Sequence, residues 1–316
     1  MYTLNPDTYS HIVQLLPIDS INQLRITNST NFQQLSALRN SNNFWKLRLQ
    51  KVLNIQITYG FPTQTWYDLY TKITSGKLNL SKKLSNFAQT GDLQVVQLLI
   101  QLGAGVTALD NFAIREASRH GHLQVVQLLI KTGADITARD NFAIRRASSN
   151  GHFQVVQLLI AAGADVTARD NFAIRETSSE GHFRVVQLLI AAGADVTAND
   201  NEALWEASTY GHSQVVQLLI EAGADVTAEN NSAIREASAY GHYQVVQLLI
   251  KAGADVTANN NEPIREASRY GHPKIVKLLI EAGADVTIRN NEALRAASKY
   301  GYFEVTQLLR DAGATL

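Results

Sequence analysis

The sequence predicts an all-α fold in which short helix pairs repeat along a solenoid, preceded by a small helical domain. Two rows of glycines carry this prediction, because they recur every 30 residues from Gly91 to Gly301 and from Gly103 to Gly313. Between the glycines lie two apolar segments with helical spacing, and neither can bury its apolar face without a neighbouring unit. A fixed period of this kind is stronger evidence for the fold than any single motif.

The domain organisation follows from the period. The chain has 316 residues, and eight 30-residue units fill residues 77–316. Residues 1–76 do not follow the period, which predicts a separate N-terminal domain.

The unit at residues 140–169 shows how each helix pair is predicted. Ile144 and Ala147 lie on one face of a short first helix, and Gly151 ends it. The second helix carries the apolar residues Val155, Val156, Leu158, Leu159 and Ile160. Gly163 follows as the expected left-handed cap, and the polar segment after it predicts an extended turn.

The repeated segments GH (first complete at Gly121–His122), VVQLLI and GADVTA resemble the ankyrin repeat over all of residues 77–316. Ankyrin units typically have about 33 residues. The three residues missing here fall where the family has its projecting hairpin, so the resemblance implies shortened hairpins. The family's TPLH segment is replaced by NFAIR or NEALR, and only Pro263 retains the proline. Units of 30 residues with these segments resemble the ankyrin proteins of amoeba-infecting giant viruses, the mimivirus-like group.

Both ends of the array carry polar substitutions. Thr306 and Arg310 stand where the inner units have Val and Ile, and Lys82, Lys83 and Asn86 make the first unit polar. Polar outer faces are expected of capping repeats, so the sequence predicts a complete array.

Residues 1–76 contain several apolar segments with helical spacing and resemble the F-box. The residues that carry the pattern are Leu4, Pro6, Ile12, Leu16, Pro17, Ile21, Leu24 and Trp45. Asn5 stands where the F-box usually has proline. The resemblance implies that these residues dock on a Skp-family adaptor protein of a cullin–RING ubiquitin ligase. The alternative is a helical cap that only shields the first repeat.

Composition excludes several classes of function. Lys+Arg and Asp+Glu are 28 each, so no basic excess favours nucleic acid or an anionic membrane. The absence of cysteine excludes disulfides, thiolate metal sites and ubiquitin transfer through a thioester. No apolar run is long enough to span a bilayer, and the N-terminus lacks the pattern of a signal peptide. We therefore expect a cytoplasmic monomer (in the host cytoplasm if viral).

No cofactor, metal or catalytic residue is predicted. Six histidines recur in the GH segments, but stacked units lie roughly 10 Å apart, too far to share one metal ion. We expect these histidines to make hydrogen bonds to the loops. No Ser/His/Asp set or phosphate-binding loop stands apart from the repeat pattern.

Arginines form a row at one repeat position, with glutamates directly beside them. The row consists of Arg115, Arg145, Arg175, Arg235, Arg265 and Arg295, and its neighbours are Glu116, Glu176, Glu206, Glu236 and Glu266. An Arg–Glu ladder between units is the structural interpretation; an acidic protein partner and nucleic acid are the alternatives. Trp205 interrupts the row and is a candidate binding anchor.

Two further rows are candidates for target binding on the side that is concave in ankyrin proteins. Before the GH segments lie Arg119 and four tyrosines, Tyr210, Tyr240, Tyr270 and Tyr300. Tyrosine suits protein interfaces, although these tyrosines could instead pack on one another. Phe112, Phe142 and Phe172 occupy a position that later units fill with Glu or Ser. They form either hydrophobic staples at the helix starts or an apolar contact patch.

The favoured function is a non-enzymatic adaptor. In it the ankyrin repeats bind an unknown protein target and the F-box-like region recruits the ubiquitin ligase. The alternative is an ankyrin scaffold whose N-terminal helices only cap the solenoid.

Overall fold

A computed structural model gives the structure of the chain and describes residues 79–315. The predicted domain at residues 1–76, its boundary and its proposed adaptor-binding residues lie outside the described residues. The described part forms sixteen α-helices and no strand. It divides into two compact units. The first comprises residues 79–87 and Asp92–Val106, and the second comprises Ala88–Gly91 and residues 107–315.

The helices come in eight pairs, as the 30-residue period predicts. The first helices of the pairs are α6 (Leu80–Thr90), α8 (Ala108–Arg119), α10 (Ala138–Ser149), α12 (Ala168–Ser179), α14 (Ala198–Thr209), α16 (Ala228–Ala239), α18 (Ala258–Arg269) and α20 (Ile288–Tyr300). The second helices are α7 (Leu93–Gln101), α9 (Leu123–Lys131), α11 (Phe153–Ala161), α13 (Phe183–Ala191), α15 (Ser213–Glu221), α17 (Tyr243–Lys251), α19 (Pro273–Glu281) and α21 (Phe303–Asp311).

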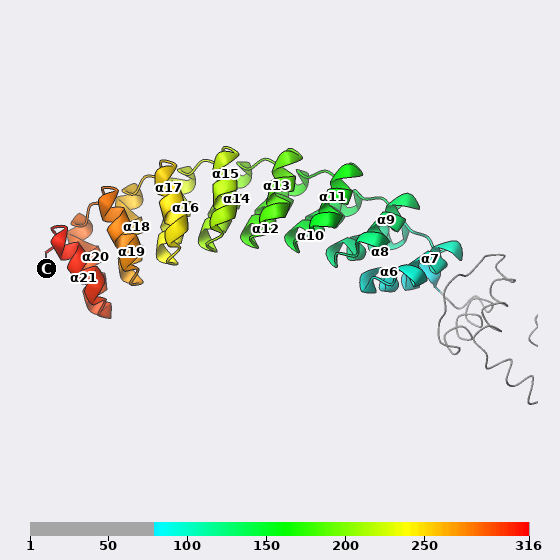
Figure 1. Cartoon of the computed structure of the whole chain (residues 1–316), viewed down its shortest axis with the longest axis horizontal. Helices are drawn as coiled ribbons and strands as arrows, with labels where there is room; N and C mark the ends of the chain where they lie inside the picture. The colour runs from blue at the N-terminus through cyan, green and yellow to red at the C-terminus, as the bar shows by residue number, and fades with distance from the viewer. Residues whose placement is uncertain (1–78, 316) are drawn as a thin grey trace, which may run out of the picture. The chain divides into compact units, whose positions relative to one another are not determined.

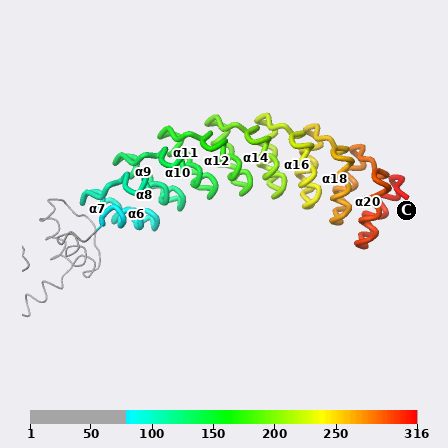
Figure 2. Tube along the Cα trace, turned by 180° about the vertical axis from the view of Figure 1, so that it is seen from behind, coloured from blue at the N-terminus to red at the C-terminus, as the bar shows by residue number. Residues whose placement is uncertain are grey.

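The second unit is a row of stacked helix pairs. Within it, first helices pack against first helices of the next pair and second helices against second helices. Figure 1 shows this row from α8 to α21, and Figure 2 shows it from behind. Ile144, Val156 and Leu159 are fully buried, and so are their equivalents along the row except Thr306, which takes the place of Val156 in the last repeat and is half-buried. The core is therefore continuous from pair to pair, which confirms the predicted ankyrin solenoid.

A compact left-handed turn forms the start of each first helix of the second unit. In α8 the turn consists of Leu109, Asp110 and Asn111, with φ of 55°, 55° and 58°. Residues with side chains rarely adopt this conformation, but Asn and Asp tolerate it because they can hydrogen-bond locally. The second and third turn residues are Asp or Asn in all seven copies. The shortened connection thus takes the form of a left-handed turn, and the extended turn expected from the sequence is not found there.

The last asparagine of each turn also joins neighbouring repeats. The Oδ1 atom of Asn171 accepts a hydrogen bond from the backbone N–H of Asp195, 24 residues later, at 2.8 Å. The same bond recurs from Asn111 to Asn291 along the second unit. These seven asparagines, here called the asparagine bridges, fix one repeat against the next through the backbone.

The GH segments form a second connection between repeats. Gly121 has φ of 76°, and a Cβ atom on it would lie 2.6 Å from Nδ1 of His152. The Nε2 atom of His152 donates a hydrogen bond to the carbonyl oxygen of Arg119 at 2.9 Å. His122, His212, His242 and His272 make the same bond. The predicted structural role is confirmed for these five histidines.

Candidate protein-binding surface

The arginine row of the first helices holds the left-handed turns in place. Nε of Arg115 donates to the carbonyl oxygen of Asp110 at 2.9 Å, and Nη2 donates to that of Leu109 at 3.2 Å. Arg145 and Arg265 repeat both bonds. Burial lowers the pKa of Arg115 and Arg145, and the positive charge of the following turn's arginine adds to this in each case. Each of these guanidinium groups therefore caps the turn that begins its own helix.

In the N-terminal half of the second unit, the arginines alternate with phenylalanine rings. Arg115 lies over Phe112 and Phe142, at 5.3 and 5.2 Å from the ring centroids. Arg145 lies over Phe142 and Phe172, at 5.7 and 5.1 Å. A guanidinium this close to a ring face is attracted by its quadrupole. The half-buried rings of Phe142 and Phe172 thus contact arginines of two repeats, and that of Phe112 contacts Arg115 of its own repeat. Neither sequence interpretation included this contact.

In the C-terminal half, glutamate takes the place of these phenylalanines and forms ion pairs with the same arginine row. Arg235 Nη1 lies 3.1 Å from Glu262 Oε2, and Arg265 Nη1 lies 3.0 Å from Glu292 Oε2. Arg175 pairs with Glu202 in the same way. The predicted ladder between repeats therefore exists in this half.

Its glutamates, however, are not the ones predicted from the sequence. The partners were expected directly beside the arginines, whereas they lie at the start of the next repeat's first helix. Among the expected glutamates, Glu266 pairs with Arg269 on its own helix at 3.1 Å. Glu206 accepts a hydrogen bond from Ser179 Oγ at 3.2 Å. Adjacent positions on a helix point in different directions, which explains the exchange of partners.

Burial raises the pKa of Glu206 and Glu266. The hydrogen bond from Ser179 opposes the shift of Glu206, and Arg269 opposes that of Glu266. The negative charges of Glu262 and Glu292 add to the rise at Glu266. Burial therefore disfavours the charged form of these two glutamates.

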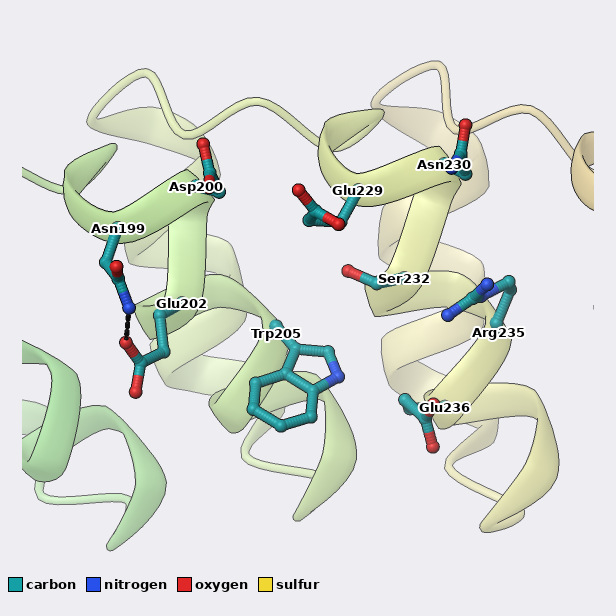
Figure 3. Close-up of a pocket in the computed structure, with 9 residues that line it drawn as sticks. All are labelled: Asn199, Asp200, Glu202, Trp205, Glu229, Asn230, Ser232, Arg235 and Glu236. Carbon is teal, nitrogen blue, oxygen red and sulfur yellow. Dashed lines mark hydrogen bonds between the residues drawn. The ribbon is translucent and has the colours of Figure 1, made fainter.

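Trp205 breaks the arginine ladder on α14. The side chain is 37% exposed, and the residue facing it on the next repeat is Ser232 instead of Phe or Glu. A groove of about 560 Å³ opens beside the indole. It is lined by Asn199, Asp200, Glu202, Trp205, Glu229, Asn230, Ser232, Arg235 and Glu236. Figure 3 shows Trp205 on one repeat facing Ser232, Arg235 and Glu236 on the next.

The tyrosine row is exposed. Tyr210, Tyr240, Tyr270 and Tyr300 are between 54% and 61% accessible. The ring of Tyr240 stacks on His242 of its own repeat at 6.4 Å, and Tyr210 stacks on His212 in the same way. The ring contacts recorded for this row in residues 79–315 are of this local kind, so the tyrosines do not pack on one another. Arg119, at the equivalent end of α8, is exposed as well.

A second, smaller hollow of about 350 Å³ lies next to Tyr300. Its lining includes Arg269, Arg295, Lys299 and Glu292. Lys299 Nζ lies 5.4 Å from the centroid of the Tyr300 ring. This end of the row is therefore rich in cations, in contrast with the groove beside Trp205.

In residues 79–315, no group of three or more His, Asp or Glu side chains could hold a metal ion. None of the helices described there has the length and apolar character needed to cross a membrane.

The comparisons with known proteins agree with this architecture. The family model described as ankyrin repeats (three copies) matches residues 84–170, 172–260 and 236–316. No curated protein matches the chain. Among the solved structures that match, the crystal structure of the human ASB11 ankyrin repeat domain is 22% identical, with a TM-score of 0.57. The match covers 64% of this chain and 98% of the ASB11 chain, and at this identity it concerns the fold alone.

Proposed function

Because the chain belongs to the ankyrin-repeat family, whose repeats are typically non-enzymatic scaffolds for protein–protein interaction, we propose that it binds a protein target through its first helices. The proposed target-binding residues are Arg119, Trp205, Tyr210, Tyr240, Tyr270, Tyr300, Phe112, Phe142 and Phe172. The surface they form is called the first-helix surface below.

The observation that carries the proposal is the exposed tyrosine row. Four tyrosines recur at one repeat position in consecutive repeats, each with more than half of its surface accessible. Tyrosine offers a large contact area, loses little conformational entropy on binding and carries a polar tip, so interfaces are enriched in it. A row of this kind supports an elongated contact with another protein.

The phenylalanines contribute less exposed area than the tyrosines. Their rings are half-buried, and those of Phe142 and Phe172 lie between guanidinium groups. Under this proposal they extend the first-helix surface into the N-terminal half, with Arg119 at its edge. The tyrosines and Trp205 carry most of the binding energy, because hot spots are typically large aromatic residues.

The test uses two matched double variants of the full-length chain in affinity capture followed by direct binding measurements. Tyr240→Ala with Tyr270→Ala removes the centre of the row. Gln217→Ala with Gln247→Ala changes two exposed residues of α15 and α17, on the second helices. We expect the tyrosine variant to lose at least tenfold in affinity for a captured target and the glutamine variant to keep it. Equal loss, or no loss in either variant, contradicts the proposal.

We further propose that residues 1–76 connect this surface to a cullin–RING ubiquitin ligase through a Skp-family adaptor. The support is the F-box-like sequence pattern around Leu16 and Trp45. The proposal implies a monomer that acts in the cytoplasm, and in a host cytoplasm if the chain is viral, as its resemblance to giant-virus ankyrin proteins suggests.

Co-purification with a Skp-family adaptor tests this second step. Leu16→Asp and Trp45→Ala are expected to abolish adaptor binding and to leave target binding unchanged. Deletion of residues 1–76 separates the adaptor from the alternative, an ankyrin scaffold with a helical cap. If the deletion destabilises the repeats and no adaptor binds the intact chain, residues 1–76 serve only as a helical cap of the solenoid.

A further inference from the structure

We propose that the groove beside Trp205 binds an arginine side chain of the protein target. The partner's guanidinium fills the place that the chain's own arginine fills in the other repeats of the second unit. This inference rests on the proposed function, because it names the chemistry of the target at one point of the first-helix surface.

In other repeats of the second unit, the arginine at this position contacts both its own turn and the next repeat. Arg145 donates to the carbonyl oxygens of Asp140 and Arg139 at 2.8 and 3.0 Å. It also lies over the ring of Phe172 on the next repeat, 5.1 Å from the centroid. The space between two first helices is therefore built to hold a guanidinium against backbone oxygens and the next repeat.

At the groove, two residues that face each other on neighbouring repeats both differ from the other repeats of the second unit. Trp205 replaces the arginine, and Ser232 replaces the Phe or Glu that would face it. The turn carbonyls of Asn199 and Asp200 are equivalent to those that accept from Arg145 two repeats earlier. No arginine of their own repeat reaches them. The small Ser232 leaves the groove of about 560 Å³ open next to the indole.

The groove is mainly negative in charge. Its lining includes four carboxylates, from Asp200, Glu202, Glu229 and Glu236, and one cation, Arg235. Glu202 pairs with Arg175, and Arg235 pairs with Glu262 of the following repeat. Among the ion pairs of residues 79–315, none involves Asp200, Glu229 or Glu236. The groove therefore presents three carboxylates whose charges no cation of the described chain neutralises at close range.

Arg235 gives independent support, because it departs from the ladder at this point. In Arg115, Arg145, Arg175 and Arg265 the Nε atom donates to the carbonyl of the turn. In Arg235 the Nε atom is buried and has no hydrogen-bond partner. The turn on that side of the groove, at Glu229 and Asn230, is thus also not capped by its own arginine.

These features fit arginine better than lysine. A guanidinium can stack on the indole face while its donors reach carboxylates and backbone oxygens in a fixed fork. An ammonium is a compact point charge and cannot stack in this way. In Figure 3, Glu229 and Glu236 come from the repeat that faces Trp205, with Glu229 near the turn and Glu236 further along the helix.

The experiment titrates the full-length chain with short, terminally blocked peptides. One peptide carries a single arginine between glycine and serine residues, and matched peptides carry lysine or the neutral isostere citrulline. Fluorine NMR of 5-fluorotryptophan-labelled protein reports on Trp205 separately from the other two tryptophans of the chain. The resonance is assigned as the one missing in Trp205→Arg.

We expect the arginine peptide to shift the Trp205 resonance, the lysine peptide to bind several-fold more weakly, and the citrulline peptide at least tenfold more weakly. Trp205→Arg restores the residue of the other repeats, so it is expected to fold and to close the groove. Lost binding by this variant is read from peptide-induced shifts of backbone amides near Ser232. Glu229→Gln with Glu236→Gln is expected to weaken the arginine peptide about tenfold, whereas Glu221→Gln, an exposed acidic residue on α15, is not.

Equal binding of the arginine and citrulline peptides, or unchanged binding by Trp205→Arg, overturns the inference. Failure of the proposed function is a different result. In that case the tyrosine double variant leaves target binding intact, while the arginine peptide still binds at Trp205. If the target instead binds the first-helix surface and Trp205→Arg does not weaken it, the inference about the target's arginine is wrong and the function stands.

Discussion

The two halves of the second unit use one arginine row in two ways. On α8 and α10, each guanidinium lies between phenylalanine rings of its own repeat and the next. On α16 and α18, it forms ion pairs with glutamates at the same position of the next repeat. The hydrophobic core beneath is the same in both halves, since equivalent residues are fully buried.

Outside Arg235, the arginine keeps its bond to the turn whether it meets a ring or a carboxylate on the next repeat. Its bonds to the turn carbonyls recur in both halves, for example at Arg145 and Arg265. The residue on its outer side is free to vary between an aromatic ring and a carboxylate. The side chain that faces the arginine therefore sets the local chemistry of the first-helix surface.

Removing a buried core side chain should give the largest loss in the free energy of unfolding, and the loss should be equal in the two halves. Leu159→Ala and Leu249→Ala each empty a fully buried position in α11 and α17. We expect each to lower the free energy of unfolding by about 2–5 kcal/mol, measured by urea denaturation. A loss in one half much greater than in the other contradicts the claim of an equivalent core.

Breaking an asparagine bridge should cost less, again equally in both halves. Asn171→Ala and Asn231→Ala remove the bond to the next repeat and place alanine in a left-handed turn. Glycine at the same positions removes the bond but tolerates the turn. We expect about 1 kcal/mol for glycine, and about 1–2 kcal/mol more for alanine. If glycine and alanine cost the same in thermal or urea unfolding, backbone strain is not part of the effect.

Replacing the ring or carboxylate that contacts the arginine row should change stability in both halves, but the change should depend on salt only in the C-terminal half. Phe142→Leu removes the ring from between Arg115 and Arg145, and Glu262→Gln removes the partner of Arg235. Both should cost about 0.5–1 kcal/mol at low salt. In about 1 M salt the cost of Glu262→Gln should fall, because salt screens this half-buried ion pair in part. The cost of Phe142→Leu should remain.

The outcome that counts against this interpretation is an equal response of both variants to salt. Glu262→Phe is the complementary variant, since it installs the residue of the N-terminal half. It should fold with little change in stability and lose the salt dependence.

The smallest effect is expected from pH at Glu266. Burial raises the pKa of Glu266, so the native state binds more protons than the unfolded chain between the unfolded value of 4.5 and the raised pKa. Its contribution to the free energy of unfolding therefore increases as pH falls through the raised pKa, and the increase is complete below the unfolded value. Glu266→Gln should be more stable relative to the wild type at about pH 7 than at about pH 4, by less than about 0.5 kcal/mol.

Urea denaturation at the two pH values measures this difference. Glu221→Gln removes an exposed negative charge of the same half and serves as the control. Glu262→Phe in the chain that keeps Glu266 should reduce the pH dependence, because it removes one of the negative charges that raise the pKa of Glu266. If the difference between the two pH values is the same for Glu266→Gln and Glu221→Gln, burial of Glu266 is not its cause.

The repeat architecture was predictable because periodicity determines it. The position of Gly121 implies a left-handed residue, and the apolar spacing around Leu159 implies a buried second helix. The interactions at the surface were less predictable. The sequence places Glu116 next to Arg115, but neighbouring positions on a helix do not face each other, so the ladder partner is 27 residues away, as for Arg235 and Glu262.

The left-handed turns could not be derived from the missing three residues alone. The signal was the repeated Asp-Asn or Asn-Asn pair, since these residue types tolerate positive φ. Likewise, the alternation of Phe172 and Glu202 at one position indicated a partly exposed site but not an arginine partner. That partner is set by the stacking of one repeat on the next, which sequence spacing does not measure.

The asparagine bridges and the GH contacts have a mechanical consequence. Both connect a repeat only to its neighbour: the asparagine bridges at seven positions of the second unit and the GH contacts at five. A chain pulled from its ends would therefore release one helix pair at a time once these links fail. At about 3.3–3.6 Å per extended residue, each 30-residue unit adds roughly 100 Å of contour length, so the force trace of a single molecule would show a regular series of equal steps.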